Sequence, residues 1–150
     1  MNEVSIECRD IGEPPWRFSA EAFALGVLDF LALENWSLSV LFCADEFMQY
    51  LNREYRDKDE PTDVLSFIMG ESLEVEGRER YIAGDIVISI PAMERNSAEF
   101  GVGPDEELKR LLVHGILHLS GKDHENNDAS QPMLVEQERI LAALQGEHIL

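Results

Sequence analysis

Basic residues are scarce in this chain of 150 residues, in which 12 Lys and Arg stand against 30 Asp and Glu for a formal net charge of −18. Proteins that bind nucleic acid over a broad surface usually carry an excess of positive charge. The deficit therefore argues against general nucleic-acid binding, while it leaves room for a local basic patch. The acidic residues are spread along the chain rather than collected in a tail, which is typical of a well-solvated surface.

Cysteines and long apolar runs are also few. Cys8 and Cys43 are far apart and form no Cys-x-x-Cys motif. No run approaches the ~18 apolar residues of a membrane-spanning helix, and the first residues lack the basic and apolar regions of a secretory signal. We therefore expect a cytoplasmic protein that has no membrane partner and keeps both thiols reduced and buried.

Hydrophobic residues make up 45% of the chain, which is enough for a well-packed core at this length. Alternating or continuous apolar residues predict strands, and apolar residues at helical spacing predict helices. The expected strands are 4–8, 36–43, 63–67 and 81–90, with a hairpin tip at 71–80; the expected helices are 19–33, 45–55, 91–100, a long one opening at 105, and 132–144. Ser19 and Asp45 are the expected helix caps. This order predicts an α+β fold, a single compact domain over residues 1–150 with a mixed, roughly four-stranded sheet packed with helices.

Three of the four histidines lie within eleven residues, at His114, His118 and His124. On a helix, His114 and His118 point the same way from consecutive turns. Gly121 suits the end of that helix, after which the chain can turn back and bring His124 to the other two. Three imidazoles with no fourth histidine or cysteine nearby are typical of a catalytic zinc site, because one coordination position stays open for water. The sequence therefore predicts a metal site on the central helix and the turn that follows it.

The spacing of these residues matches the metzincin protease frame H-E-x-x-H-x-x-G-x-x-H, with one difference. Gly115 stands where that frame has its general-base glutamate, which a peptidase needs to take a proton from the metal-bound water. Met133 invites comparison with the Met-turn of those proteases, but is more simply a core residue or a helix start. The sequence thus predicts the metal ligands of a protease without its base.

The histidine stretch and three upstream segments together resemble the YbeY family of bacterial ribosomal-RNA maturation endoribonucleases. The segments are Leu51-Asn-Arg-Glu-Tyr-Arg56, Pro61-Thr-Asp-Val-Leu-Ser-Phe67, Gly84-Asp-Ile-Val-Ile-Ser89 and His114-Gly-Ile-Leu-His-Leu-Ser-Gly-Lys-Asp-His124, in the family's order. The resemblance covers roughly residues 35–145. Two departures are Lys122, where the family usually has an aromatic residue, and Ile68, where proline is common.

The resemblance implies a compact α+β domain with one Zn²⁺ held by His114, His118 and His124. It implies cleavage of single-stranded regions of ribosomal RNA during maturation and quality control of the small subunit, with the ribosome or small-subunit proteins as partners. By position, Arg56 is the family's functionally important arginine. We expect Arg56 to act in catalysis and in substrate binding, and Lys58 to contact substrate.

Physical chemistry leaves alternatives at these residues. The guanidinium of Arg56 suits a phosphate, but Arg56 could equally be a surface residue paired with Asp57 or Glu60, and Lys58 could simply be solvated. Second carboxylates often orient metal-bound histidines. The candidates for this role are Asp63, Asp85 and Asp123, each of which could instead cap a turn. His148 is expected to be exposed.

Three functions therefore compete. The leading one is a zinc-dependent endoribonuclease. A metallopeptidase is disfavoured because Gly115 replaces the glutamate. A non-catalytic ribosome-binding factor would need an Asp or Glu as a fourth ligand to close the zinc site.

Overall fold

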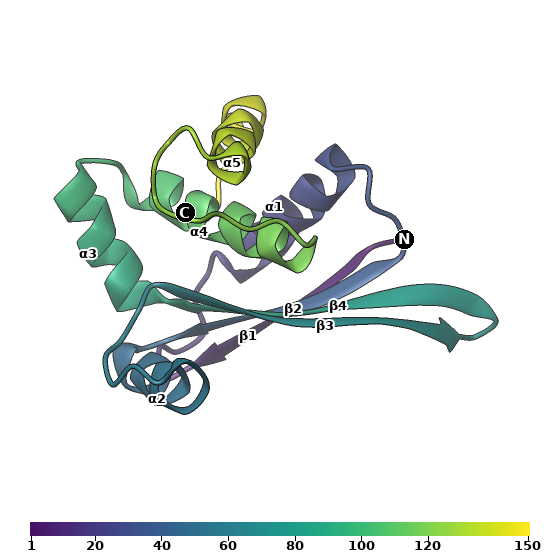
Figure 1. Cartoon of the computed structure of the whole chain (residues 1–150), viewed down its shortest axis with the longest axis horizontal. Coiled ribbons are helices and arrows are strands. Elements are labelled where there is room, and N and C mark those ends of the chain that lie inside the picture. Colours follow the sequence, from purple (N-terminus) through teal and green to yellow (C-terminus); the bar gives the residue numbers. More distant parts are fainter.

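The computed structural model describes all 150 residues as five helices and four strands (Figure 1). The strands are β1 (Glu3–Arg9), β2 (Trp36–Cys43), β3 (Val64–Val75) and β4 (Arg78–Ser89). The helices are α1 (Arg17–Phe30), α2 (Asp45–Arg56), α3 (Ile90–Phe100), α4 (Pro104–Leu119) and α5 (Pro132–Ala143). All the predicted elements are present, in the predicted order.

The strands form one mixed sheet in the order β1-β2-β4-β3, which confirms the α+β fold class. β1, β2 and β4 are parallel, whereas β3 runs antiparallel to β4 at the sheet edge. The predicted hairpin tip at 71–80 was too wide, because β3 continues to Val75 and β4 begins at Arg78. The side chains there are mostly polar and show no apolar alternation, so the sequence did not predict that both strands extend beyond the core as an exposed arm (Figure 1).

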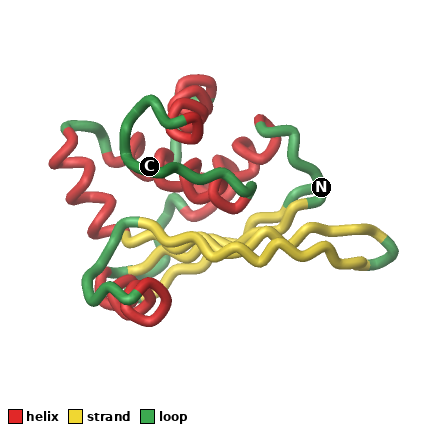
Figure 2. The backbone as a smooth tube through the Cα atoms, in the orientation of Figure 1, coloured by secondary structure: helices red, strands yellow, loops and turns green.

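Helices cover both faces of the sheet. α1, α4 and α5 lie on one side and α2 lies on the other (Figure 2). The main core fills the space on the first side and includes Val27, Ile86, Leu112 and Ile116. A smaller cluster, which includes Met48 and Leu51, packs under α2 on the second side. α4 is therefore held between the sheet and α5.

Two predicted helix caps are wrong. α1 begins at Arg17, two residues before Ser19, and ends at Phe30 rather than near Leu33. At α2 the N-cap residue is Ala44, whose backbone is extended, and Asp45 is the first residue of the helix with its carboxylate engaged elsewhere. It accepts hydrogen bonds from Ser89 Oγ at 2.8 Å and from Arg95 Nη1 at 2.7 Å. These tertiary partners outcompete local capping.

The two thiols differ in burial, and both are free. Cys43 is buried, and burial raises the pKa of its thiol to about 12. Cys8 is only half-buried, so the expectation that it is buried was wrong.

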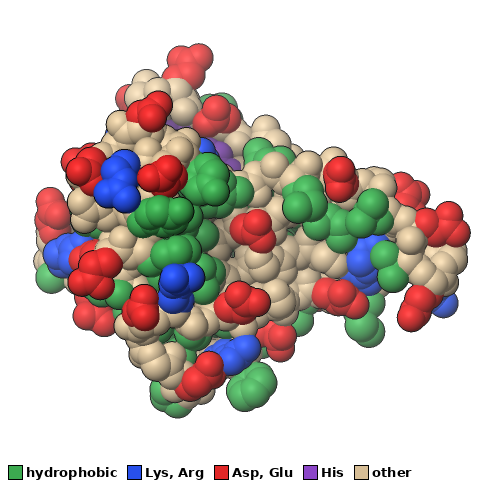
Figure 3. Space-filling view, turned by 90° about the horizontal axis from the view of Figure 1, so that it is seen from below, with side chains coloured by type: hydrophobic (Ala, Val, Ile, Leu, Met, Phe, Trp, Pro, Cys, Tyr) green, Lys and Arg blue, Asp and Glu red, His purple; other side chains and the backbone are tan.

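Acidic side chains are scattered over the face that carries α2, with fewer basic ones among them (Figure 3). No helix in the structure has both the length and the apolar character that a membrane-spanning segment requires.

Candidate metal centre

α4 brings two of the three histidines to the surface of the core. Acidic residues Asp105, Glu106 and Glu107 occupy its first turn, where they complement the positive end of the helix dipole. Its apolar residues are buried, while His114 and His118 are only partly so. After α4 ends at Leu119, Gly121 adopts a positive φ of 94°. The chain then turns back and carries His124 to the helix, as the sequence predicted.

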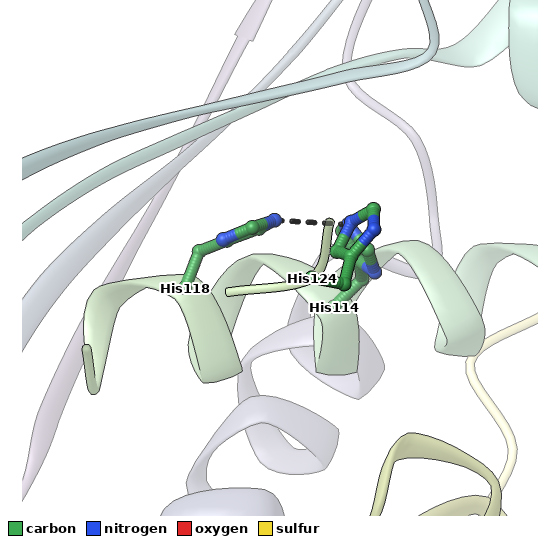
Figure 4. Close-up of side chains that lie close together, drawn as sticks. All are labelled: His114, His118 and His124. Carbon is green, nitrogen blue, oxygen red and sulfur yellow. Dashed lines mark hydrogen bonds between the residues drawn. The ribbon is translucent and has the colours of Figure 1, made fainter. Parts of the chain in front are cut away.

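The three imidazoles converge on one point (Figure 4). His114 Nε2 and His118 Nε2 are 3.1 Å apart. The ring of His124 lies 5.1 Å from that of His114 and 5.5 Å from that of His118, centroid to centroid. One ring nitrogen from each histidine lies within 4.8 Å of the others, which is close enough to share a metal ion.

Each ring contacts an oxygen through its other nitrogen. His114 Nδ1 lies 2.7 Å from Gln137 Oε1, and His124 Nδ1 lies 2.8 Å from the carbonyl oxygen of Asn126. His118 Nδ1 lies 3.1 Å from the carbonyl oxygen of Lys122. Since an oxygen acceptor requires a proton on Nδ1, these contacts favour, in each ring, the tautomer whose Nε2 carries the lone pair that a metal ion would need. The set fits a zinc ion, which prefers such neutral imidazoles.

Burial favours this neutral form. Desolvation lowers the pKa of His114 and of His118, and a positive charge on the neighbouring His124 would lower both further. The two helix histidines are therefore neutral near pH 7, as metal ligands must be.

Sequence reasoning missed Gln137, a buried residue of α5 that orients His114. Its amide nitrogen donates to Glu138 Oε2 at 3.1 Å, and Glu138 in turn accepts two hydrogen bonds from Arg110. This chain of contacts ties the ring of His114 to α4 and α5 together. In the sequence Gln137 stands between Glu136 and Glu138, so no local pattern distinguishes it from a solvated helix residue or says which side chain it meets.

Asp63, Asp85 and Asp123 were the carboxylates expected to orient a metal-bound histidine, and none of them hydrogen-bonds a histidine ring. Asp63 accepts from the backbone N–H of Val64 and from Asn96 Nδ2, and Asp123 accepts from the backbone N–H of His124. Asp85 hydrogen-bonds Ser39 on β2 and lines a cavity with residues of α2, away from the histidines. For Asp63 and Asp123 the turn-stabilising alternative is the one observed.

Arg56 lies beside the histidines, although it is far from them in sequence. It lines a cavity of about 320 Å³ together with Ser66, Ile68, His114 and His118. Its Nη2 donates to the carbonyl oxygen of Ser66 at 3.0 Å, and its guanidinium lies 5.1 Å from the centre of the Phe67 ring. It forms an ion pair with neither Asp57 nor Glu60, whose pairing was the alternative left open by the sequence. Its charge therefore stays available within this cavity.

Lys58 is exposed in the loop after α2, and it lines neither of the two larger cavities that contain His114. Its part in substrate binding stays a prediction. His148 is exposed, as expected, and contacts Asp105 Oδ2 at 2.9 Å.

Gly115 faces the sheet rather than the histidines. A Cβ at this position would lie 2.8 Å from Ile86 Cγ2 on β4, so the glycine lets α4 pack closely on the sheet. A glutamate here would clash with the core instead of reaching the space between the three histidines. Met133 is buried in the core, which is the simpler of its two interpretations.

A family model described as Endoribonuclease YbeY matches residues 16–145 of the chain. Proteins named Endoribonuclease YbeY from Treponema pallidum and Treponema denticola are 48% and 50% identical to it. The first alignment covers 95% of this chain and 89% of the relative, and the second covers 93% and 92%. A Thermotoga maritima protein solved in solution superposes with a TM-score of 0.65 and 28% identity, covering 96% of this chain and 90% of that one. The match to the family model begins at residue 16, earlier than roughly residue 35, where the sequence resemblance begins. The chain belongs to the endoribonuclease YbeY family.

Proposed function

We propose that this protein is a zinc-dependent endoribonuclease of the cytoplasm. Its substrate is single-stranded ribosomal RNA, which it cleaves during maturation and quality control of the small subunit. The family supports RNA cleavage, since its model and its curated relatives carry the name endoribonuclease. The ribosome or its small-subunit proteins are the partners that this role requires.

The observation that carries the proposal is the convergence of three imidazoles next to a guanidinium that belongs to no ion pair. The group of mutually close ligand atoms comprises His114, His118 and His124, without a carboxylate or thiolate. Three protein ligands leave a position free, whereas structural zinc sites are closed by four. This favours an enzyme over a ribosome-binding factor with a structural zinc.

A zinc ion on the three imidazoles supplies Lewis-acid chemistry towards a phosphodiester and its attacking water. The histidines themselves offer neutral Nε2 atoms, and their Nδ1 partners fix the ring planes. Arg56 holds its guanidinium in the adjoining cavity through the carbonyl oxygen of Ser66. There it can bind a non-bridging phosphate oxygen and stabilise the negative charge that develops on phosphorus.

A metallopeptidase is disfavoured on geometry. Position 115 packs against Ile86, so no carboxylate at the equivalent place can act as general base. An extended peptide substrate would pair with β3, the edge strand beside the histidines. Arg56 already donates to a carbonyl of that strand, which leaves this acceptor unavailable to a peptide.

The test is zinc content and cleavage of a defined single-stranded RNA by zinc-loaded protein, with His114→Ala as the variant. We expect about one zinc per chain and RNA cleavage in the parent protein, and loss of both in the variant. His148→Ala is the matched control, because that imidazole lies outside the cluster and should keep zinc and activity. Full zinc affinity in His114→Ala would rule out the metal centre, and zinc binding without cleavage would favour the ribosome-binding factor.

A further inference from the structure

The histidines border a second cavity, of about 580 Å³, on the side away from Arg56. It lies between the end of α3, the outer face of α4, α5 and the loop after His124. His114 lines both cavities. Anything bound in the second cavity therefore lies next to the proposed metal centre.

The two cavities differ in charge. In the first, Arg56 belongs to no ion pair. In the second, Arg110 is the basic residue, and three carboxylates surround it. Its Nη2 donates to Glu138 at 2.9 Å, while its Nη1 lies 3.4 Å from Glu106 and 3.6 Å from Glu107. No cation is left for a phosphate, so the phosphate belongs on the Arg56 side.

The second cavity instead offers an aromatic face. Phe100, the last residue of α3, is 62% exposed although it is a large apolar side chain. The helix stops directly after it, where Gly101 takes a positive φ of 67°. Phe100 shares the cavity wall with Val102 and Leu134. An exposed phenyl ring on an apolar wall is the kind of surface on which single-stranded bases stack.

Two carboxylates, which are hydrogen-bond acceptors, also line this cavity. Asp63 and Glu107 both line it, and Asn96 Nδ2 donates to Asp63 Oδ2 at 2.9 Å and to Glu107 Oε2 at 3.4 Å. The shared amide holds the two carboxyl groups in place and leaves them further acceptor capacity. Carboxylates accept hydrogen bonds from exocyclic amino groups of bases. Uracil has a carbonyl oxygen at the equivalent position and would be repelled.

We propose that this cavity binds one nucleobase of the substrate, stacked on Phe100, and that it selects bases with an exocyclic amino group over uracil. The inference rests on the proposed function, since it names the part of an RNA strand that the second cavity takes. The scissile phosphate then lies between the base cavity and Arg56, at the histidines.

The first test measures binding of single nucleosides to the zinc-loaded protein by NMR titration. Nucleosides contain no phosphodiester, so they are not cleaved and report on the base cavity alone. We expect cytidine and adenosine to bind more tightly than uridine. Phe100→Ala should weaken their binding by about tenfold, the size of a typical base-stacking contribution, while Phe100→Tyr keeps it. Phe18→Ala, which removes an exposed phenyl ring from α1, should change nothing.

A second variant tests the preference for bases with an exocyclic amino group over uracil. Glu107→Gln offers an amide that can donate to the carbonyl oxygen of uracil, so the preference for cytidine over uridine should shrink or reverse. Equal binding of all nucleosides by the parent protein, or binding that is the same in Phe100→Ala, would overturn the base cavity. If the parent protein cleaves RNA but nucleoside binding does not depend on Phe100, the base cavity is overturned and the proposed function stands. Nucleoside binding that depends on Phe100, without RNA cleavage, supports the cavity and overturns the proposed function instead.

Discussion

At the scale of single residues, the site is built from neutral hydrogen bonds rather than from the carboxylates that often orient metal-bound histidines. Two of the three oxygen acceptors are backbone carbonyls in the turn after α4. The third is the Gln137 side chain on α5. Backbone acceptors cannot be removed by substitution, which makes Gln137 the point at which ring orientation can be tested.

Replacing Gln137 with Leu should weaken zinc binding by about 10–100-fold, the usual effect of losing such a partner. Gln137→Glu keeps an acceptor for His114 Nδ1 and should retain most of the affinity. The measurement is competition for zinc with a chelator. Gln145→Leu, at an exposed position after α5, is the control. Unchanged affinity in Gln137→Leu would show that packing alone orients the ring.

Arg56 is the second residue whose role can be isolated. Arg56→Ala should keep the fold and the zinc but lose most RNA cleavage, and Arg56→Lys should recover little, because lysine offers a point charge where a forked donor is wanted. Cleavage rates and zinc content are measured together. Arg78→Ala, which removes another exposed arginine, is the control. RNA cleavage by Arg56→Ala at the full rate would show that Arg56 has no role in catalysis.

At the scale of elements, α4 does two things at once. One side packs against β4 through Gly115, and another presents His114 and His118. The close approach to the sheet is what places the histidines beside β3 and Arg56. The two faces of the helix are therefore coupled through a glycine.

Gly115→Ala should destabilise the protein by about 1–3 kcal/mol, because the added methyl group collides with Ile86 in a packed core. Gly26→Ala, on α1, is the matched control. A Cβ there meets nothing within 4 Å, so the higher helix propensity of alanine should stabilise by about 1 kcal/mol. Chemical denaturation of both variants measures the difference. Equal effects at the two positions would contradict the packing argument.

The N-terminus of α4 also anchors the C-terminal tail. Asp105 accepts hydrogen bonds from the backbone N–H groups of Ile149 and Leu150. Burial acts to raise the pKa of Asp105, but the hydrogen bonds from Leu150, His148 and Ile149 and the charge of Lys109 outweigh it and lower the pKa. A carboxyl group whose pKa is lowered in the folded state stabilises the protein above its unfolded pKa, and that contribution is lost as the pH falls through the folded value.

Asp105→Asn should therefore lower the melting temperature at pH 7 and have a smaller effect in strong acid, where the parent carboxyl group is also protonated. Melting curves across pH provide the measurement. Glu94→Gln, an exposed carboxylate of α3, should leave the curves unchanged. A destabilisation that is the same at every pH would show that the charge of Asp105 plays no part.

At the scale of the whole molecule, charge limits how the protein meets RNA. Of its 12 basic residues, those outside every ion pair are Arg56, Lys58 and Arg78. The others are neutralised by nearby carboxylates within a chain of net charge −18. No broad basic surface is available to follow a phosphate backbone, so electrostatic attraction to free RNA should be weak.

If about three phosphates are contacted, the logarithm of RNA affinity should fall with the logarithm of salt concentration at a slope of about −2 for single strands. Cleavage of isolated RNA should be slow, and cleavage on a ribosomal particle faster, since protein contacts can then hold the enzyme against the repulsion. Salt titrations with a short strand, together with rates on naked and particle-bound RNA, test both points. A slope of about −5 or steeper, or faster cleavage of naked RNA, would contradict this charge argument.

The sequence by itself determined the cluster of three histidines and the order of the elements. Helical periodicity fixes His114 and His118 on one face, and a glycine three residues on allows the return of His124; both are local effects. Alternation predicted β1 and β2 nearly to the residue. Local patterns failed where polar residues form strands, as in the arm of β3 and β4, and where Asp45 found distant partners instead of capping its own helix.

The tertiary structure alone decided what surrounds the histidines. Gln137 is 23 residues from His114, and nothing in the intervening sequence states that they meet. The approach of Arg56 depends on β3 lying at the sheet edge beside α4, and the cavity at Phe100 depends on how α3, α4 and α5 are placed around it. Such contacts arise when helices and strands pack, because packing brings together side chains whose separation along the chain no periodicity records.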